Sequence, residues 1–435
     1  MSFRSLLSAV IVWTAGASHV YAADADVEFW YGHSGVAGSA IQDICDRFNS
    51  THPKLLPMRC IAQGSYEQNL QKTVAAYRSG KAPALVEIYD VATLEMLNSG
   101  AVISLEGFLR SQNKAPQDPL LPSVAAYYST ADGEVWAQPF ATSTAVLYSH
   151  ADQLAAAGIR QAPDTWEAFG AAMTALKAHG SKCPAVTDIG PWVWLEQSSA
   201  VMGAPLLSKD PVRWVFDQGL HLRLMEWVEL WMANDLLIDQ AATRSGGQEL
   251  AFAAGDCALM LGSTGASKLV YSADPSDVNA NFLPVFAGQQ RSASLPGGAA
   301  LWVLRGQNSA QYQTVAEFLM FLREVSVQTL FSEATGYLPV TQGAATAYRA
   351  QLPARSATVV GLNSMAQGEK TKAFEVRPGF NTLLRLAWQQ QVWSALAGQK
   401  PMADALHQAA KKGDSLLRLF ENTYGSTKND KGLNP

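Results

Sequence analysis

Charged residues are scarce in this 435-residue chain. Asp, Glu, Lys and Arg together make up 16% of it, whereas about 25% is typical of globular proteins. The formal net charge is -5, so the chain lacks the basic excess that neutralises nucleic-acid phosphates. Hydrophobic residues, by contrast, form 48% of the sequence, which excludes a disordered chain. Length alone favours about two to three folded domains.

Long apolar runs are also missing after the N-terminus. No later stretch reaches the ~18 apolar residues that suggest a membrane span, which predicts a soluble mature protein. The N-terminus itself carries Arg4, a short apolar run over residues 6–17 and small residues up to Ala22. This order is typical of a secretory signal, and the run is shorter than the ~20 residues of a membrane anchor. We therefore expect a signal peptide over residues 1–22, cleaved after Ala22.

Only four cysteines occur, and none forms a CxxC motif or a zinc-type spacing with histidine. In an oxidising compartment four cysteines can pair in about three ways. Cys45 lies on a predicted helix and Cys60 on the strand that should pack against it, so a bridge between them is plausible. Cys183 and Cys257 are then left over, and we expect them to be two buried free thiols.

Catalytic motifs are absent as well. The seven histidines form no HExxH pair, and the sequence contains no GxSxG elbow, phosphate-binding loop or GxGxxG string. Ser111 and Lys114 have SxxK spacing without the motifs that usually accompany it. We therefore expect no metal and no cofactor, and the sequence favours a binding protein over an enzyme.

What the sequence does contain is a succession of short apolar strands and amphipathic helices. The first strands are expected at residues 27–31, 58–62 and 84–88, with helices at 39–48 and 66–78 between them. Such alternation predicts a parallel α/β sheet. Further strands are expected at 144–148, 258–261 and 300–304, and the last 130 or so residues are mostly helical. No Gly/Ser-rich linker separates them, so any two lobes must be intimately connected.

Three positions suit a ligand but also have ordinary structural explanations. Ser263 follows a strand and begins a segment that can be helical, so it could contact an anion or simply cap a helix. The pair Gly297-Gly298 permits close backbone approach to a ligand or a simple turn. Arg385 lies in an apolar helix, where it either pairs with an acid or reaches into a cleft as an anion receptor.

Several strings of residues resemble one known family in their order along the chain. They are Gly64-Ser-Tyr66-Glu-Gln-Asn69, Gly80-Lys-Ala-Pro-Ala-Leu85, Tyr89-Asp90, Gln138-Pro-Phe140 with Ser143-Thr144, Gly297-Gly-Ala-Ala-Leu-Trp302 and Thr335-Gly-Tyr337-Leu-Pro339. Together with the late Arg385, this order resembles the periplasmic sn-glycerol-3-phosphate-binding proteins of ABC importers, within the extracellular solute-binding proteins that include the maltose-binding type. The resemblance covers residues 27–420, and it implies a periplasmic location.

The resemblance also implies a fold. It is an α/β protein of two lobes, a type II periplasmic binding protein whose lobes are joined by crossing hinge strands and close on the ligand like a flytrap. We expect the N-terminal lobe to comprise residues 23–140 and 264–302, and the C-terminal lobe to comprise 141–263 and 303–435.

Matched motif by motif, the resemblance implies a set of ligand-binding residues: Tyr66, Asp90, Ser143, Ser263, Gly298, Tyr337 and Arg385. In this set Arg385 faces a phosphate, while Asp90 holds the glycerol hydroxyls. At the position of Asp90 the family carries Glu, which is a methylene longer. Trp166 and His33 are further candidates for the cleft wall, although Trp166 is more readily explained as a core residue.

The function that the resemblance implies is capture of sn-glycerol-3-phosphate, or of glycerophosphodiesters such as glycerophosphocholine. The expected partners are two membrane permease subunits and a cytoplasmic ATPase. Two alternatives stay open. The 12 tryptophans would suit an oligosaccharide- or polyol-binding protein of the same fold. An exported phosphodiesterase is an alternative from a different class.

Overall fold

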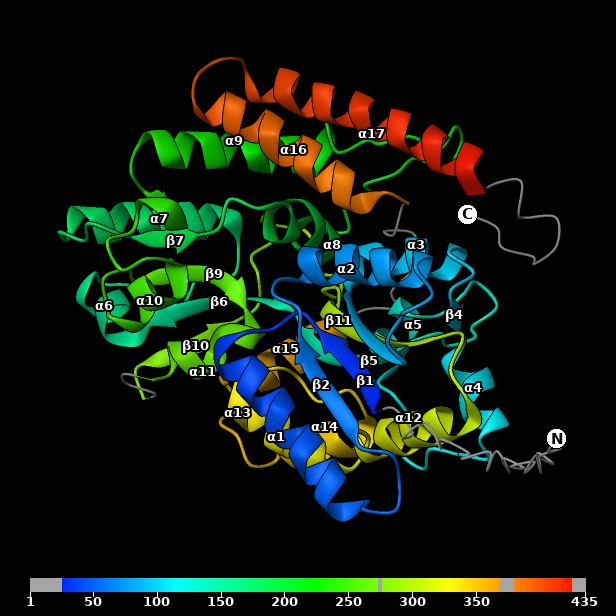
Figure 1. The fold of residues 1–435 in the computed structure, drawn as a ribbon. Helices are drawn as coiled ribbons and strands as arrows, with labels where there is room; N and C mark the ends of the chain where they lie inside the picture. Colours follow the sequence, from blue (N-terminus) through cyan, green and yellow to red (C-terminus); the bar gives the residue numbers. More distant parts are fainter. Residues whose placement is uncertain (1–25, 273–275, 368–378, 425–435) are drawn as a thin grey trace, which may run out of the picture.

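Two β-sheets, each covered by helices, form the two lobes of the protein (Figure 1). A computed structural model describes residues 26–272, 276–367 and 379–424. The expected signal peptide lies outside these residues. Within them, no helix is both long enough and apolar enough to cross a membrane.

The first sheet has the strand order β2-β1-β3-β11-β4, with β5 paired to β11. Its strands are β1 (Val27–Tyr31), β2 (Met58–Ala62), β3 (Leu85–Tyr89), β4 (Val102–Ile103), β5 (Gln138–Ser143) and β11 (Gly297–Leu304). Strand β1 runs parallel to both β2 and β3, as the alternation of strands and helices predicts. Strand β11 returns from the other lobe and is antiparallel to β3, β4 and β5.

The helices of this lobe are α1 (Gly35–Thr51), α2 (Tyr66–Arg78), α3 (Thr93–Asn98), α4 (Leu105–Ser111), α5 (Pro122–Tyr127), α12 (Ser309–Phe321), α13 (Val325–Thr335) and α14 (Gln342–Arg349). A short helical turn, η1 (Asp90–Ala92), follows β3 directly. Helix α2 begins where the sequence predicts, because Ser65 and Gln68 form a reciprocal capping box. Helix α1 begins earlier than expected, at Gly35 rather than near Ser39.

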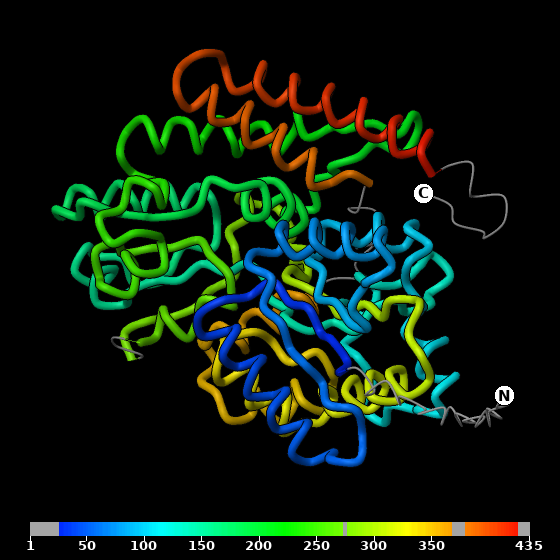
Figure 2. The backbone as a smooth tube through the Cα atoms, viewed as in Figure 1, coloured from blue at the N-terminus to red at the C-terminus, as the bar shows by residue number. Residues whose placement is uncertain are grey.

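The second sheet has the order β10-β6-β9-β7-β8. Its strands are β6 (Ala145–His150), β7 (Ala185–Thr187), β8 (Leu237–Asp239), β9 (Leu259–Ser263) and β10 (Val278–Asn281). Its helices and helical turns are α6 (Ala151–Ala156), α7 (Trp166–Ala178), η2 (Trp192–Gln197), α8 (Ser198–Val201), α9 (Gly219–Ala233), η3 (Gln240–Ala242), α10 (Gln248–Ala253), η4 (Thr264–Ala266), α11 (Ser267–Val270), α15 (Ala357–Met365), α16 (Asn381–Leu396) and α17 (Met402–Tyr424). Helices α16 and α17 lie side by side next to α9 at the outer face of this lobe (Figure 2).

The lobes are joined where the chain crosses from β5 to β6, with Thr144 alone between the two strands. Thr144 is fully buried and exchanges two hydrogen bonds with Thr264, which follows β9 in the second sheet. The side chain of Thr144 also donates to Ser294, just before β11. The crossing segments are therefore tied to one another at one point, which is the hinge-strand arrangement that the resemblance implies.

Several segments lie outside the lobe boundaries expected from the sequence, among them β10 and the helices α12 and α13. Strand β10, in the range assigned to the first lobe, pairs with β6 in the second sheet. Helices α12 and α13, in the range assigned to the second lobe, bury Phe318 and Phe331 in the core of the first. The reason is that the chain re-enters the first sheet with β11 and packs two helices on it. Afterwards it returns to the second lobe, first with α15 and then with α16 and α17.

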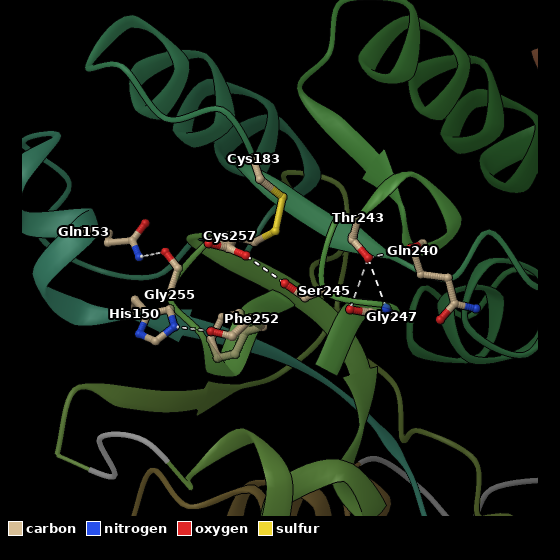
Figure 3. The surroundings of a disulfide bond; sticks show 11 residues. His150, Gln153, Cys183, Gln240, Thr243, Ser245, Gly247, Phe252, Gly255 and Cys257 are labelled. Carbon is tan, nitrogen blue, oxygen red and sulfur yellow. Dashed lines mark hydrogen bonds between the residues drawn. A yellow bond between two sulfur atoms is a disulfide. The ribbon is translucent and has the colours of Figure 1, made fainter. Parts of the chain in front are cut away.

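All four cysteines are paired in disulfides, one in each lobe. Cys45 on α1 is bonded to Cys60 on β2, the pairing that the sequence made plausible. The expectation of two free thiols is wrong, because Cys183 is bonded to Cys257 with their Cα atoms 4.6 Å apart (Figure 3). Each of these two residues lies two positions before a strand, and those strands, β7 and β9, are parallel neighbours.

Candidate functional site

The candidate residues from both lobes meet near the hinge, where Arg385 of the second lobe contacts the first lobe. Its guanidinium lies on α16 of the second lobe, with Nη2 3.6 Å from Oδ2 of Asp90 on the first lobe. The hydroxyls of Tyr89 and Thr382 share a hydrogen bond of 3.0 Å beside this contact. Tyr89 ends β3 directly before Asp90, and Thr382 lies in the first turn of α16. The first turn of α16 therefore lies against the end of β3.

Arg385 also has a closer partner, which the sequence reading missed. Glu196 in η2 accepts from Nε at 2.7 Å and is bonded a second time by Nη2. A bidentate Arg–carboxylate pair is strong and fixes the plane of the guanidinium. Burial lowers the pKa of Arg385, but Glu196 and Asp90 outweigh burial, so the pKa is raised and the cation is permanent. Of the two interpretations left open for Arg385, pairing with an acid is the one described by these contacts.

Asp90 is buried at the same junction, where Tyr127 donates to its Oδ2 at 3.3 Å. Burial raises the pKa of Asp90 to about 6, and the lowering effect of Arg385 offsets this only in part. The offset is incomplete because Nη2 lies closer to Glu196 than to Asp90. Asp90 is therefore a buried acceptor that still carries its charge at neutral pH.

Two of the expected phenols meet on the first lobe. Tyr66 begins α2, and Tyr337 follows α13, where Leu338 N–H donates to Thr142 on β5. The two hydroxyls interact with each other. Burial raises the pKa of Tyr66 well above its ordinary value and that of Tyr337 to about 12. Both phenols are therefore neutral hydrogen-bond donors throughout the physiological range.

His33 joins this pair, and its place in the cleft wall stays a prediction. Its Nε2 lies 3.0 Å from the Tyr66 hydroxyl, and its ring packs edge-on against Tyr66 and Tyr337. The same Nε2 atom also lies 2.9 Å from Oε1 of Glu87, a fully buried carboxylate on β3. The sequence reading missed Glu87. Its signal was a single acid in an otherwise apolar strand.

Ser143 and Gly298 lie in neighbouring residue pairs where β5 pairs with β11. Residue pairs Gly297–Ser143 and Gly298–Thr142 are in register, followed by a bulge before Ala300. Gly298 has a φ of 102°, and a Cβ there would lie 1.8 Å from the carbonyl oxygen of Ala141. A larger residue cannot be accommodated at this position. A simple turn does not describe Gly298, because it is a strand residue in β11 in close contact with the Ala141 backbone; its approach to a ligand stays a prediction.

Ser263 ends β9 beside the same cluster. Its hydroxyl accepts from the backbone N–H of Gly265 at 3.0 Å, which makes it a helix cap. A Cβ on Gly265 would lie 3.0 Å from the Tyr337 ring, so this turn packs against Tyr337. The cap explains the serine without a ligand, and its proximity to Tyr337 keeps it among the candidates for contact.

Trp166 does not line the cleft. It is fully buried in the core of the second lobe and packs against Trp194 and Trp231. It begins α7, whose apolar face covers the second sheet, so the core interpretation of Trp166 is correct. The tryptophan beside the candidate residues is instead Trp192, whose ring nitrogen would lie 2.6 Å from a Cβ on Gly297.

One group of side chains in the described residues has the spacing of a metal site: His150, Asp152 and Asp277 offer atoms within 4.8 Å of one another. Protein partners already explain these contacts. His150 Nδ1 lies 2.7 Å from Asp277, and its Nε2 lies 2.8 Å from the carbonyl oxygen of Phe252 (Figure 3). The group joins β6, α6 and the chain before β10, away from the candidate residues.

The fold and the position of these residues define a class of protein. Two α/β lobes, crossing strands and a polar cluster between the lobes are the features of two-lobed periplasmic binding proteins. A profile of the bacterial extracellular solute-binding proteins matches residues 43–357, and the chain belongs to this family. The fold class expected from the sequence is thereby confirmed.

Individual relatives agree with this assignment. The sn-glycerol-3-phosphate-binding periplasmic protein UgpB of Escherichia coli (strain K12) is 30% identical over 423 residues, 92% of this chain and 94% of the relative. UgpB of Yersinia pseudotuberculosis is 29% identical over 413 residues, 91% of this chain and 93% of the relative. The relatives are named periplasmic proteins, and this chain is a periplasmic solute-binding protein, as predicted.

Solved structures share the fold at lower identity. UgpB of Mycobacterium tuberculosis in complex with glycerophosphocholine has a TM-score of 0.74 at 20% identity, covering 91% of this chain and 98% of that one. The acarbose-binding receptor GacH of Streptomyces glaucescens has a TM-score of 0.75 at 16% identity, covering 90% and 98%. These structures include proteins with different ligands, so they show the fold and do not identify the ligand of this chain.

Proposed function

We propose that this chain is the substrate-binding component of an ABC importer and that it captures sn-glycerol-3-phosphate or a glycerophosphodiester in the periplasm. The observation that carries the proposal is the junction at which Arg385 and Asp90 of different lobes approach within 3.6 Å, next to the Tyr66–Tyr337 pair. Relatives named for sn-glycerol-3-phosphate binding over 91% of this chain support it.

Each part of such a ligand has a chemical counterpart in this cluster. A phosphate oxygen needs charged or strongly polar donors, which the phenols of Tyr66 and Tyr337 and the guanidinium of Arg385 supply. The described contacts of Arg385 use Nε and Nη2, so the two N–H groups of Nη1 remain for a ligand. A glycerol diol needs an acceptor, and Asp90 is an ionised one at neutral pH.

The partners and the absence of turnover are part of the same proposal. We infer that two membrane permease subunits and a cytoplasmic ATPase receive the ligand from this protein. We also infer that the protein releases the ligand unchanged. Metal-assisted hydrolysis of a phosphodiester needs metal ligands near the phosphate, and the group of described residues with metal-site spacing, His150, Asp152 and Asp277, lies away from the cluster.

An oligosaccharide ligand is less well supported than the tryptophan content suggested. Trp166, Trp194, Trp302 and Trp388 are all fully buried, so their rings cannot stack on a sugar. They account for a third of the 12 tryptophans in the sequence.

Native mass spectrometry of the protein released from the periplasm tests the proposal. We expect a bound mass that matches a glycerol phosphate or a glycerophosphodiester, recovered intact after incubation with the protein. A bound oligosaccharide would contradict the proposed ligand, and hydrolysis of the added diester would contradict the transport role.

A further inference from the structure

The strongest feature that the proposed function does not use is the buried pair of His33 and Glu87. Glu87 has no solvent exposure and lies on β3, three residues before Asp90. Its two oxygens have separate partners, because Oε1 faces His33 Nε2 and Oε2 accepts from the backbone N–H of Gly32 at 2.9 Å. A charged carboxylate is found in a core only with such partners.

The turn that carries His33 is fixed by close packing. A Cβ on Gly32 would lie 2.8 Å from the Tyr66 ring, so only glycine allows this approach. A Cβ on Gly38 would lie 3.1 Å from the carbonyl oxygen of His33. The structure uses the turn to direct His33 between Glu87 and Tyr66.

The hydrogen-bond directions follow from the chemistry of the partners. A carboxylate can only accept, so His33 Nε2 carries a hydrogen and donates toward Glu87. The same Nε2–H group faces the Tyr66 oxygen at 3.0 Å. The hydrogen of the Tyr66 hydroxyl must therefore point to another acceptor, which is Tyr337 here and a ligand oxygen when one is bound.

We propose that His33 is a positioning residue for phosphate recognition. Glu87 holds its imidazole, the imidazole directs the Tyr66 hydroxyl toward an anionic ligand oxygen, and protonation of His33 strengthens the binding of that anion. The inference rests on the proposed function and identifies a determinant of affinity that the ligand set expected from the sequence does not contain.

The surroundings of His33 favour its charged form. Burial lowers its pKa, but the Glu87 carboxylate and its hydrogen bond outweigh burial, so the pKa of His33 is raised above the ordinary value. The other titratable groups that face it are the phenols of Tyr31 on β1, Tyr66 on α2 and Tyr337 after α13. All three have raised pKa values and stay neutral. Among the groups that face one another here, His33 is therefore the one expected to change charge above pH 6.5, whereas Asp90, with a pKa of about 6, changes charge at lower pH.

Titration calorimetry with glycerophosphocholine between pH 6.5 and 9 tests the inference. This diester is a zwitterion whose phosphate keeps one negative charge over the range, and the range lies above the pKa of about 6 of Asp90. We expect the affinity of the wild type to fall about tenfold as His33 loses its proton, which is the effect of about 1.4 kcal/mol. Buffers of different ionisation heat should show proton uptake on binding at the upper end of the range.

Three variants separate position from charge. His33→Gln keeps a donor toward Glu87 and Tyr66 but cannot be protonated, so its affinity should be independent of pH and close to that of the wild type at pH 9. Glu87→Gln should move the midpoint of the pH dependence to lower pH. His407→Gln is the matched control, because His407 also pairs with a carboxylate, Asp217, but lies on α17 of the other lobe. It should behave as the wild type does.

The possible results are distinguishable. If the wild type binds and His33→Gln keeps the same pH dependence, the inference is wrong while the proposed function stands. If the wild type binds neither glycerophosphocholine nor sn-glycerol-3-phosphate at any pH, the proposed function and the inference are both wrong. If only sn-glycerol-3-phosphate binds, the same variants are compared with that ligand. The ionisation of the sn-glycerol-3-phosphate itself then affects the wild type and every variant equally.

Discussion

The two sides of the candidate site differ in how they present charge. On the first lobe, Tyr66 and Tyr337 are neutral donors, and the charges behind them belong to the His33–Glu87 pair. On the second lobe, a single permanent cation, Arg385, is held by Glu196 and approached by Asp90. The first lobe thus presents neutral hydrogen-bond donors, and the pair behind them can change its charge. The second lobe presents a fixed cation whose charge is more than balanced by carboxylates.

This difference has a consequence for the ligand. Arg385 contributes one positive charge, and Glu196 and Asp90 contribute two negative ones, so the junction carries a net charge of -1. A dianionic phosphate monoester meets more repulsion there than a monoanionic diester does. The proton on His33 counters that repulsion from the first lobe.

The comparison of the lobes extends to their covalent bonds, where the largest effect on stability is expected. The disulfide of the second lobe spans 74 residues and that of the first spans 15. In the chain-entropy model, removing them costs about 4.5 and about 3 kcal/mol respectively. Chemical denaturation of the Cys183→Ser/Cys257→Ser and Cys45→Ser/Cys60→Ser double variants measures both. Equal losses would show that loop length does not decide their relative contributions.

Arg385→Ala tests the fixed cation. Without it, Glu196 is left as a buried carboxylate near Asp90, and the ligand loses charged hydrogen bonds worth roughly 1.5–3 kcal/mol each. We expect affinity for sn-glycerol-3-phosphate to fall by about a hundredfold, and stability to fall by about 3 kcal/mol because a buried charge loses its partner. Calorimetry and thermal denaturation measure the two effects. Arg418→Ala, at an exposed arginine on α17, is the control. Unchanged ligand affinity in folded Arg385→Ala would restrict Arg385 to a structural role.

Glu196→Gln sharpens the comparison by changing the charge balance and little else. The amide can still accept from Arg385 Nε, and the net charge of the junction rises by one. We expect the affinity for sn-glycerol-3-phosphate relative to that for glycerophosphocholine to rise about fivefold, since the dianionic phosphate gains more than the singly charged phosphate of the zwitterionic diester. The ratio of the two dissociation constants, measured on one preparation at pH 8, is the readout. A ratio equal to that of the wild type would mean that Glu196 only orients Arg385.

The smallest expected effect concerns Asp90 at acid pH. Its pKa is raised to about 6 by burial, so the carboxylate is protonated as the pH falls below that value. The protonated form is a poorer acceptor for the glycerol hydroxyls, so ligand affinity should weaken about threefold to tenfold between pH 7 and pH 5. A shift of one pKa unit on ligand binding corresponds to about a tenfold change in affinity. Asp90→Asn should bind more weakly at pH 7 and lack this acid dependence. Calorimetry with glycerophosphocholine checks both, and a dependence that survives in Asp90→Asn would assign it to another group.

Much of the fold was predictable from local signals. The alternating strands and helices of the first lobe and the capped start of α2 depend on neighbouring residues, and they appear as expected. The assignment of segments to lobes was not predictable in the same way. Whether α12 packs on the first or the second core depends on where β11 inserts, more than 150 residues from its partner β5 along the chain.

The same distinction applies to the site. Tyr66, Asp90, Tyr337 and Arg385 carry recognisable strings around them, so the sequence could predict them as candidates. Glu196 and Glu87 stand in apolar segments, and their roles come from partners far away in the sequence, 189 residues for Glu196 and Arg385 and 54 for Glu87 and His33. A lone acid in an apolar segment is the one signal that could have drawn attention to both. The Cys183–Cys257 pairing is of the same kind, because it requires β7 and β9 to be neighbours.

The central claim is that the cluster between the lobes binds a phosphate-bearing glycerol compound. The most direct test is titration calorimetry of the wild type at pH 7 with sn-glycerol-3-phosphate and glycerophosphocholine, beside glycerol and maltose as ligands without phosphate. Our account predicts saturable binding of at least one phosphate compound at one site per chain, with no measurable heat from maltose and far weaker binding of glycerol. Saturable binding of maltose, with none of either phosphate compound, would contradict it.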